Sequence, residues 1–383
     1  MLPRTSTPHV ARQVGGSALV PIDDRFTPHQ PPVIWYALGD SYTAGPGTGD
    51  DYDANLDCAR NNGSYAVQTE TDFPFKTSND MNFIACSGQK APDTLQTATT
   101  AVQQDEADFM VMTVGGNDIG FADIVVECLI KADFLPGDCD ETIQKGRQVL
   151  GSQKFEDDIH AVYDKVFEKM VDDRHYQLYH ILYNRFFNDQ TELCNDMSFS
   201  AVVPKLTRQL RRKLNLLGDD LNKRLEEVAN SYIQKQTKAS WSQGPRLFVL
   251  TPDKQKRSNG ETYGLFDGHR FCEPGRTDLK DPSVWFFGTL DKDSLEKREI
   301  EAETLEQYDT SSCHTDPKYE TDVKFNYECD LAQYSAARGG VEQAGLIALP
   351  EIISQSFHPR TAGFRAEKRM LQESLQKNRP AER

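Results

Sequence analysis

The sequence predicts an α/β fold: a doubly wound, parallel five-stranded sheet with helices on both faces. Five short runs are apolar at successive positions, which is typical of strands covered on both faces. Segments with helical periodicity separate these runs, and strands that alternate with helices form parallel sheets. In such sheets ligands bind beyond the carboxyl ends of the strands, so the loops after the five runs are the candidate sites of chemistry.

The predicted strands are the apolar runs at residues 33–38, 82–85, 109–114, 177–183 and 246–250. Periodicity predicts helices over residues 94–104, 155–173, 203–233 and 361–378. In the third of these, leucines recur at spacings of three and four, and Pro204 fits the first turn of a helix. A lid or a coiled coil would carry the same stripe, but a long helix packed on the sheet explains it most simply. The helix over 361–378 is rich in charge, and we expect it to be solvated.

We interpret residues 31–383 as a single domain, because a chain of 383 residues is within reach of one large α/β domain with insertions. Residues 1–30 contain prolines and few apolar clusters, which predicts a flexible arm. Residues 251–330 form an irregular insertion with an aromatic run and three cysteines. A long irregular segment inside a compact domain is usually functional or cross-linked.

The charge of the chain narrows the classes of partner. The formal net charge is −16, and an acidic surface repels phosphate backbones, which argues against nucleic acid as a partner. No apolar run is long enough to span a bilayer, so we expect no integral membrane segment. Neither a CxxC pair nor an HExxH motif occurs, and the sequence therefore predicts no metal and no cofactor.

The eight cysteines are even in number, which predicts disulfides and an oxidising compartment. The alternative is a set of reduced, partly buried thiols in a cytosolic protein. One feature opposes the oxidised interpretation, because residues 1–10 contain no apolar segment and no signal peptide is visible. The cysteines are Cys58, Cys86, Cys128, Cys139, Cys194, Cys272, Cys313 and Cys329.

Three of the predicted strand ends carry residues suited to acyl chemistry. Ser41 follows the first strand, and a helix that opens there would aim backbone N–H groups at a developing negative charge. Asn117 follows the third strand after two glycines, and its amide can donate to an oxyanion. Gly88 follows the second strand and could offer a backbone N–H. Each signal is weak alone, since a serine after a strand is also an ordinary helix N-cap.

A nucleophilic serine requires a base, and the best candidate is a histidine on a late loop. His358 follows an apolar helical pattern over 341–353 and precedes a proline. His269, in the irregular insertion, is its rival. His160, His175 and His180 lie in or beside predicted helices and strands, where we interpret them as structural.

Taken together, Ser41, Gly88, Asn117 and His358 resemble the SGNH (GDSL-type) hydrolases in kind, order and strand context. The resemblance covers roughly residues 33–365 and implies a flavodoxin-like sheet. It also implies hydrolysis of carboxylic esters through an acyl-enzyme on Ser41, with His358 as general base. The backbone N–H groups of Ser41 and Gly88 and the side chain of Asn117 would form the oxyanion hole.

A closer resemblance is to the secreted actinobacterial lipase and esterase branch and its fungal relatives. It is carried by residues 57–60 (Asp-Cys-Ala-Arg), 83–88 (Phe-Ile-Ala-Cys-Ser-Gly), the Cys128/Cys139 pair and residues 356–359 (Ser-Phe-His-Pro). The branch implies a secreted protein with three disulfides, a pattern that the eight cysteines of this chain could extend, and we expect a monomer. We expect the pairs Cys58–Cys86, Cys128–Cys139, Cys194–Cys272 and Cys313–Cys329.

One departure from the family pattern concerns the residue that orients the histidine. Many members have an Asp three residues before it, where this chain has Gln355. Some relatives use a backbone carbonyl instead, so we predict a Ser41–His358 dyad oriented by the main chain, with Gln355 as a possible orienting side chain and Glu351 as the nearest upstream carboxylate. The departure leaves open a catalytically inactive secreted binding protein on the same fold.

The substrate class is left open at the sequence level. Lipid esters and esters of polysaccharides or other carbohydrates fit equally well. Several aromatic side chains of the insertion could line an acyl pocket, stack on a sugar or fill a core, namely Tyr263, Phe266, Trp285, Phe286 and Phe287.

Overall fold

The five apolar runs form one parallel sheet with the strand order β2-β1-β3-β4-β5. The computed structural model describes residues 33–130, 137–170, 177–199, 204–237, 246–288 and 356–378, together with residues 315, 317 and 318. The strands are β1 (Val33–Gly39), β2 (Asn79–Phe83), β3 (Phe109–Thr113), β4 (Gln177–Ile181) and β5 (Arg246–Leu250). This confirms the predicted sheet, although β2 begins three residues earlier than its apolar run suggested.

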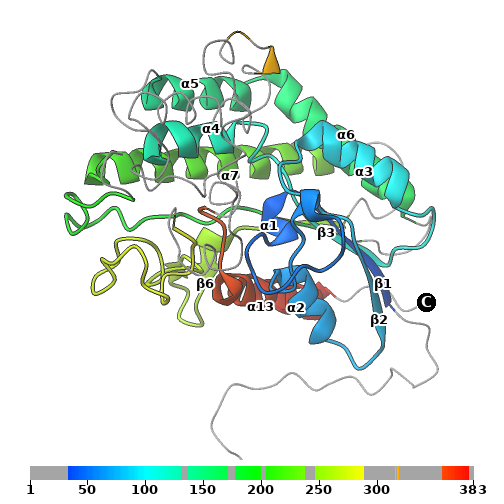
Figure 1. Ribbon diagram of the computed structural model, residues 1–383. Helices are drawn as coiled ribbons and strands as arrows, with labels where there is room; N and C mark the ends of the chain where they lie inside the picture. Colours follow the sequence, from blue (N-terminus) through cyan, green and yellow to red (C-terminus); the bar gives the residue numbers. More distant parts are fainter. Residues whose placement is uncertain are drawn as a thin grey trace, which may run out of the picture.

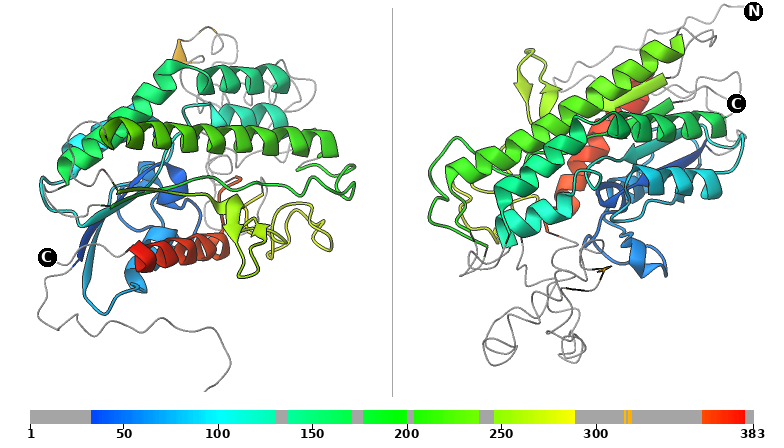
Figure 2. Two further views of the ribbon diagram at one scale, coloured as in Figure 1. Left: turned by 180° about the vertical axis from the view of Figure 1, so that it is seen from behind. Right: turned by 90° about the horizontal axis from the view of Figure 1, so that it is seen from above.

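Alternate residues of the strands feed two separate hydrophobic cores. Leu38, Met110 and Met112 face one core, whereas Ala37 and Val111 face the other. The first core lies beneath α3 (Ala91–Ala101), α4 (Phe121–Val125), α5 (Cys139–Leu150), α6 (Gln153–Lys169) and α7 (Arg208–Thr237). The second lies beneath α2 (Tyr65–Thr71) and α13 (Thr361–Asn378). Figures 1 and 2 show these two helical layers on opposite faces of the sheet.

Short elements complete the described chain. The helix α1 (Ser41–Ala44) follows β1 directly, and the 3₁₀ turn η1 (Leu56–Cys58) lies in the loop before α2. The π-helical turn η2 (Val126–Ile130) continues α4. After β5 come the 3₁₀ turn η3 (Pro252–Lys254) and a two-stranded hairpin, β6 (Gln255–Lys256) and β7 (Thr262–Tyr263). In the described residues no helix is both long and apolar enough to cross a membrane.

The helix α7 begins at Arg208, so the prediction that Pro204 occupies its first turn is wrong. The hydroxyl of Thr207 accepts a hydrogen bond from the N–H of Leu210 at 3.2 Å, which satisfies one of the free donors of the helix start. This cap outweighs the weaker preference of proline for a first turn. The leucine stripe of α7 does face the sheet, as predicted, through Leu214, Leu217, Leu221 and Leu225.

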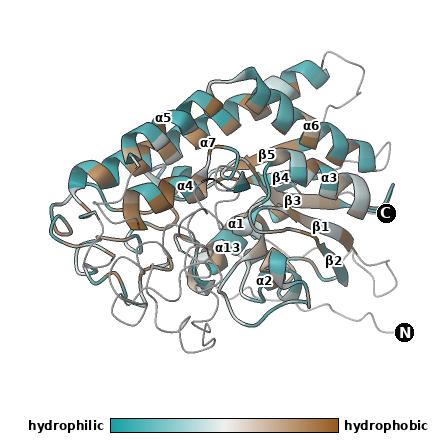
Figure 3. Cartoon of the chain, turned by 45° about the horizontal axis from the view of Figure 1, so that its top comes forward, coloured by the Kyte–Doolittle hydropathy of each residue, from teal (hydrophilic) through white to brown (hydrophobic). Residues whose placement is uncertain are grey.

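The helix α13 has the predicted bounds but is not solvated, and that expectation is wrong. One face of α13 is buried on the sheet and on α2, through Phe364, Met370, Leu371 and Leu375. Figure 3 shows hydrophilic residues along the outer sides of surface helices such as α5 and α7. The exposed positions of α13 are likewise polar or charged. The charged residues between its apolar positions hid a stripe with helical spacing.

Three of the four expected disulfides are present: Cys58–Cys86, Cys128–Cys139 and Cys194–Cys272. The fourth expected pair, Cys313–Cys329, lies outside the described residues, as do residues 1–30, most of residues 289–330, and His175.

A buried carboxyl group on α13 contacts the segment that follows β4. Glu367 is fully buried, and the side-chain N–H of Asn184 donates to its Oε1 at 2.6 Å. Burial raises the pKa of Glu367 to about 8. Within the described part of the chain, neither Oε2 of Glu367 nor Oδ1 of Asn184 has a hydrogen-bond partner. A neutral carboxylic acid supplies the proton that two such acceptors lack, whereas a carboxylate does not.

We therefore expect Glu367→Gln to stabilise the protein more at pH 8 than at pH 5. The folded state keeps its proton between the ordinary pKa of a glutamate and about 8, so wild-type stability falls across this interval by roughly 1.4 kcal/mol per pH unit, and glutamine removes that loss. Thermal unfolding from pH 5 to 9 measures the difference, with Glu373→Gln on the exposed side of α13 as a matched control. A constant difference between Glu367→Gln and wild type would contradict the buried neutral acid.

Candidate active site

The candidate nucleophile Ser41 is the first residue of α1, directly beyond the carboxyl end of β1. Asp40 caps this helix by accepting a hydrogen bond from the N–H of Tyr42 at 3.0 Å. Gly39 has a φ of +104°, and a Cβ at this position would overlap the carbonyl oxygen of Thr113 on the neighbouring strand. The tight turn that presents Ser41 therefore requires glycine.

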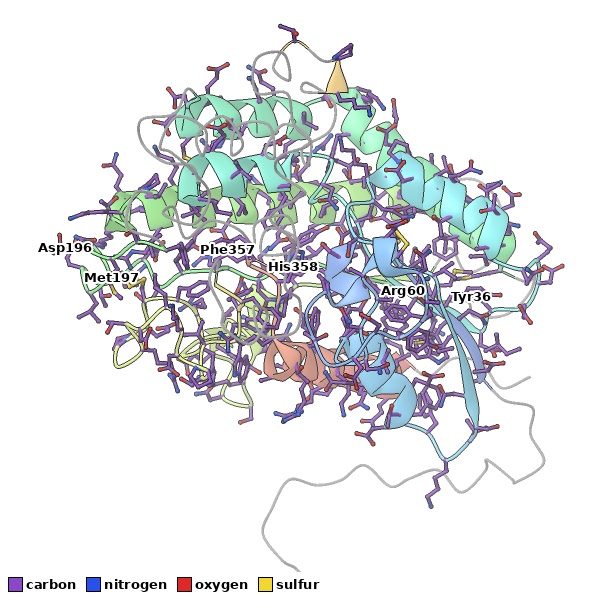
Figure 4. The ribbon with its side chains drawn as sticks, in the orientation of Figure 1. Tyr36, Arg60, Asp196, Met197, Phe357 and His358 are labelled. Carbon is purple, nitrogen blue, oxygen red and sulfur yellow. A yellow bond between two sulfur atoms is a disulfide. The ribbon has the colours of Figure 1, made fainter. Side chains whose placement is uncertain are left out.

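The candidate base His358 lies beside this serine. Nε2 of His358 is 2.6 Å from Oγ of Ser41, and both residues are nearly buried. Figure 4 shows His358 next to α1, although 317 positions separate the two residues. The structure does not bring the rival His269 to this place. Its Nδ1 lies 2.9 Å from the carbonyl oxygen of Ser283, and its ring stacks on Trp285 at 3.8 Å.

The loop that carries His358 is held on two sides. On one side, the N–H of Phe287 donates to the carbonyl of His358 at 3.0 Å, and the N–H of Phe357 donates to the carbonyl of Phe287 at 2.9 Å. On the other side, the hydroxyl of Tyr42 donates to the carbonyl of Phe357 at 2.7 Å. Tyr42 follows Ser41 in sequence, so one side chain connects the serine turn to the histidine loop.

The hydrogen bond from Tyr42 to Phe357 holds a strained stretch of backbone. Phe357 has a φ of +62°, a region that bulky residues rarely adopt, and its side chain is fully buried among aromatic rings. Burial raises the pKa of Tyr42 well above its ordinary value, so its hydroxyl remains protonated and able to donate. The ring of Tyr42 also packs against the imidazole of His358, with centroids 5.1 Å apart.

A buried carboxylate organises the strand ends around Ser41. Asp40 accepts hydrogen bonds from the hydroxyl of Thr113, the last residue of β3, and from the hydroxyl of Tyr183, two residues after β4, both at 2.5 Å. Burial raises the pKa of Asp40, whereas these hydrogen bonds and that of the Tyr42 N–H lower it. The oxygen of Tyr183 in turn accepts the N–H of Gly116 at 2.9 Å. The network thus fixes the loop of Asn117 relative to the serine.

Asn117 and Gly88 lie on loops that contact each other. The side-chain N–H of Asn117 donates to the carbonyl of Gln89 at 3.0 Å, so its amide is oriented by the residue after Gly88. Asp118 binds the same segment, since both of its oxygens accept the N–H of Ala91 at 3.0 and 3.1 Å. Burial raises the pKa of Asp118 to about 6.

The Gly88 loop is also anchored to the serine turn. The N–H of Cys86 donates to the carbonyl of Gly39 at 2.9 Å, and Cys86 is linked to Cys58 by a disulfide. Gly88 has a φ of +83° and is exposed, with open space where a Cβ would lie. A ligand can therefore approach its backbone closely.

The sequence pattern missed several residues that position this site. Tyr42 lies within the serine motif, but its type and position give no sign of this role, and Tyr183 falls at the end of the apolar run that predicts the fourth strand. Its place at a carboxyl strand end was the signal available. Gln355 and Glu351 lie outside the described residues, so the prediction about what orients His358 stays a prediction. In the described ranges no group of three or more His, Cys, Asp or Glu side chains could hold a metal ion.

Residues 37–233 match the model of the GDSL-like Lipase/Acylhydrolase family, and the chain belongs to this family. It is 29% identical over 188 residues to a lipase of Streptomyces rimosus, an alignment that covers 49% of this chain and 63% of that protein. It is also 29% identical over 99 residues to Lipase 1 of Streptomyces coelicolor, covering 26% of this chain and 35% of that one. The alignments span less than two thirds of the length of either relative.

Two solved structures share the fold. An extracellular lipase of Streptomyces rimosus superposes with a TM-score of 0.54 at 20% identity, covering 89% of this chain and 99% of that one. Phospholipase A1 of Streptomyces albidoflavus NA297 gives a TM-score of 0.54 at 18% identity, covering 90% of this chain and 99% of that one. At these identities the likeness establishes the fold and not the substrate.

Proposed function

We propose that the protein is a serine esterase or lipase that hydrolyses carboxylic esters through an acyl-enzyme on Ser41. The observation that carries the proposal is the 2.6 Å hydrogen bond between Oγ of Ser41 and Nε2 of His358, since a nucleophilic serine needs a base within this distance. Membership of a lipase and acylhydrolase family supports the same reaction class.

In the proposed mechanism His358 accepts the proton of Ser41 as Oγ attacks the ester carbonyl. The carbonyl oxygen becomes an oxyanion, which the backbone N–H groups of Ser41 and Gly88 and the amide of Asn117 stabilise. The intermediate collapses as His358 returns the proton to the departing alkoxide, and the alcohol leaves. Water then attacks the acyl-enzyme in the same way, which releases the carboxylic acid and restores Ser41.

In this proposal Ser41 and His358 form a catalytic dyad without an acidic third residue. A main-chain carbonyl near Gln355 accepts the hydrogen bond from Nδ1–H of His358. An acceptor at this nitrogen fixes the tautomer in which Nε2 can take the proton of Ser41.

The three disulfides support a location outside the reducing cytosol. The structural relative from Streptomyces rimosus is named an extracellular lipase, and we propose secretion for this chain as well.

Replacing either member of the dyad should abolish hydrolysis. We expect Ser41→Ala and His358→Ala each to lower kcat by roughly 10⁴- to 10⁶-fold, because the two residues act as one unit. A fluorophosphonate probe should label the wild type and not Ser41→Ala. His269→Ala is the matched control and should retain most activity. Near wild-type turnover in Ser41→Ala would disprove the assignment, and a wild type that neither reacts with the probe nor hydrolyses esters would favour the inactive binding protein.

Removing the amide of Asn117 should slow the chemical step. We expect Asn117→Ala to lower kcat by about 10²- to 10³-fold with a smaller change in KM, since an oxyanion donor acts mainly in the transition state. Steady-state kinetics measure the two constants, and Asn62→Ala on an exposed position of a nearby loop controls for the substitution itself. An effect confined to KM would show that Asn117 binds the ground state instead.

Tyr42→Phe removes only the hydroxyl that holds the histidine loop. We expect kcat to fall about 5- to 10-fold, in line with the loss of one hydrogen bond worth roughly 1 kcal/mol, with KM nearly unchanged. The apparent pKa in the pH profile of kcat/KM should shift as well, because this profile reports the pKa of the essential base, which is His358 in the proposed mechanism. Tyr52→Phe, whose half-buried ring packs on Phe83, is the matched control. An unchanged kcat and pH profile in Tyr42→Phe would show that the hydrogen bond from Tyr42 to Phe357 does not position His358.

A further inference from the structure

An aromatic side chain with no part in the proposed mechanism borders the dyad. Phe121 is the first residue of α4, four positions after Asn117. The N–H of Gly120 donates to the carbonyl of Asn117 at 3.1 Å, and the N–H of Phe121 donates to the carbonyl of Gly116 at 3.2 Å. Gly120 allows this turn with a φ of +76°. One turn therefore fixes both Asn117 and the ring of Phe121.

The ring of Phe121 lies against the proposed base. It is nearly perpendicular to the imidazole of His358, at 83° with centroids 6.1 Å apart, and it meets the ring of Tyr42 at 83° and 6.4 Å. The ring of Phe121 also packs against that of Phe186, with centroids 5.7 Å apart. These distances are within the range of aromatic contacts. Phe121 is thus part of the wall beside the dyad.

Exposure separates Phe121 from the aromatic core that supports it. The ring of Phe186 contacts three phenylalanines that are fully buried, namely Phe187, Phe286 and Phe357. Phe121 and Phe186 are only half-buried, so each remains partly accessible. A partly accessible apolar ring beside the imidazole can gain free energy by covering part of an apolar substrate.

The chemistry of ester hydrolysis indicates which part of the substrate this is. His358 must return its proton to the oxygen of the leaving alcohol, so the alcohol lies next to the imidazole in the tetrahedral intermediate. The acyl chain is bonded to the carbon that Ser41 attacks and extends away from the base. Phe121 contacts the imidazole and is partly exposed, so it is placed to meet the alcohol.

We propose that Phe121 is a specificity-determining residue that packs on the alcohol moiety of the ester and favours apolar alcohols. The proposal rests on the proposed function. Phe186, which is also partly exposed, packs against Phe121 and adds to the same apolar surface. Because Phe121 contacts the leaving group and takes no part in proton transfer, its loss should change selectivity among alcohols more than the rate with the smallest substrate.

Two ester series test this proposal. In the first, butyrate is esterified with methanol, butanol or hexanol, and in the second, methyl esters carry acetyl, butyryl or hexanoyl chains. We expect Phe121→Ala to lower the hexyl-to-methyl ratio of kcat/KM about 10-fold in the first series, in keeping with the loss of an apolar contact. The hexanoyl-to-acetyl ratio in the second series should stay within about 2-fold of wild type, because no contact to the acyl chain is removed.

The controls distinguish a failure of the Phe121 proposal from a failure of the proposed esterase function. Phe121→Leu keeps an apolar side chain and should give an intermediate alcohol ratio, and it decides the case if Phe121→Ala fails to fold. Phe73→Ala removes a half-buried phenylalanine from the loop between α2 and β2 and should leave both ratios unchanged. A change in the acyl ratio, or no change in either ratio, would overturn the assignment of Phe121. An inactive wild type or an active Ser41→Ala would instead overturn the proposed function.

Discussion

The buried carboxylate of Asp40 is the interaction on which the candidate site depends. A carboxyl group that is almost fully withdrawn from water is costly unless donors surround it. Here its donors are the N–H of Tyr42 on α1, the hydroxyl of Thr113 at the end of β3 and the hydroxyl of Tyr183 just after β4. The hydrogen bonds that the Asp40 carboxyl group requires therefore align the ends of three adjacent strands, β1, β3 and β4. This alignment positions Ser41 and the turn that presents Asn117.

The histidine loop depends on a different kind of constraint. Residues 356–360 lie outside the strands of the sheet, and hydrogen bonds with Phe287 and Tyr42 are among the tertiary contacts that hold them at the site. The positive φ of Phe357 persists because its ring is enclosed by Phe186, Phe199 and Phe271. Aromatic packing thus holds the strained turn that places the imidazole against Ser41.

Much of this arrangement was predictable because its signals are local. A buried parallel strand is a continuous apolar run, and a residue after such a run lies at the binding edge, which located Ser41 and Asn117. His358 was harder to place, since a histidine on a loop can lie anywhere, and its choice over His269 depended on the family resemblance. The roles of Tyr183 and Tyr42 were not predictable, because each depends on a partner far away in sequence, Asp40 and Phe357 respectively. The burial of α13 was missed because charge between its apolar residues concealed the stripe.

The disulfides restrain the loops of the site as well as the unfolded chain. Cross-links that close loops of 28 and 78 residues remove unfolded-state entropy worth about 3 to 5 kcal/mol each in the loop-closure model. The pair Cys58–Cys86 has an additional effect, since Cys86 also donates to Gly39 and Ser87 donates to Cys58. These contacts hold the segment before Gly88 against the serine turn. A loop with an exposed glycine has little side-chain packing to fix it, so the covalent link substitutes for the packing that Gly88 cannot provide.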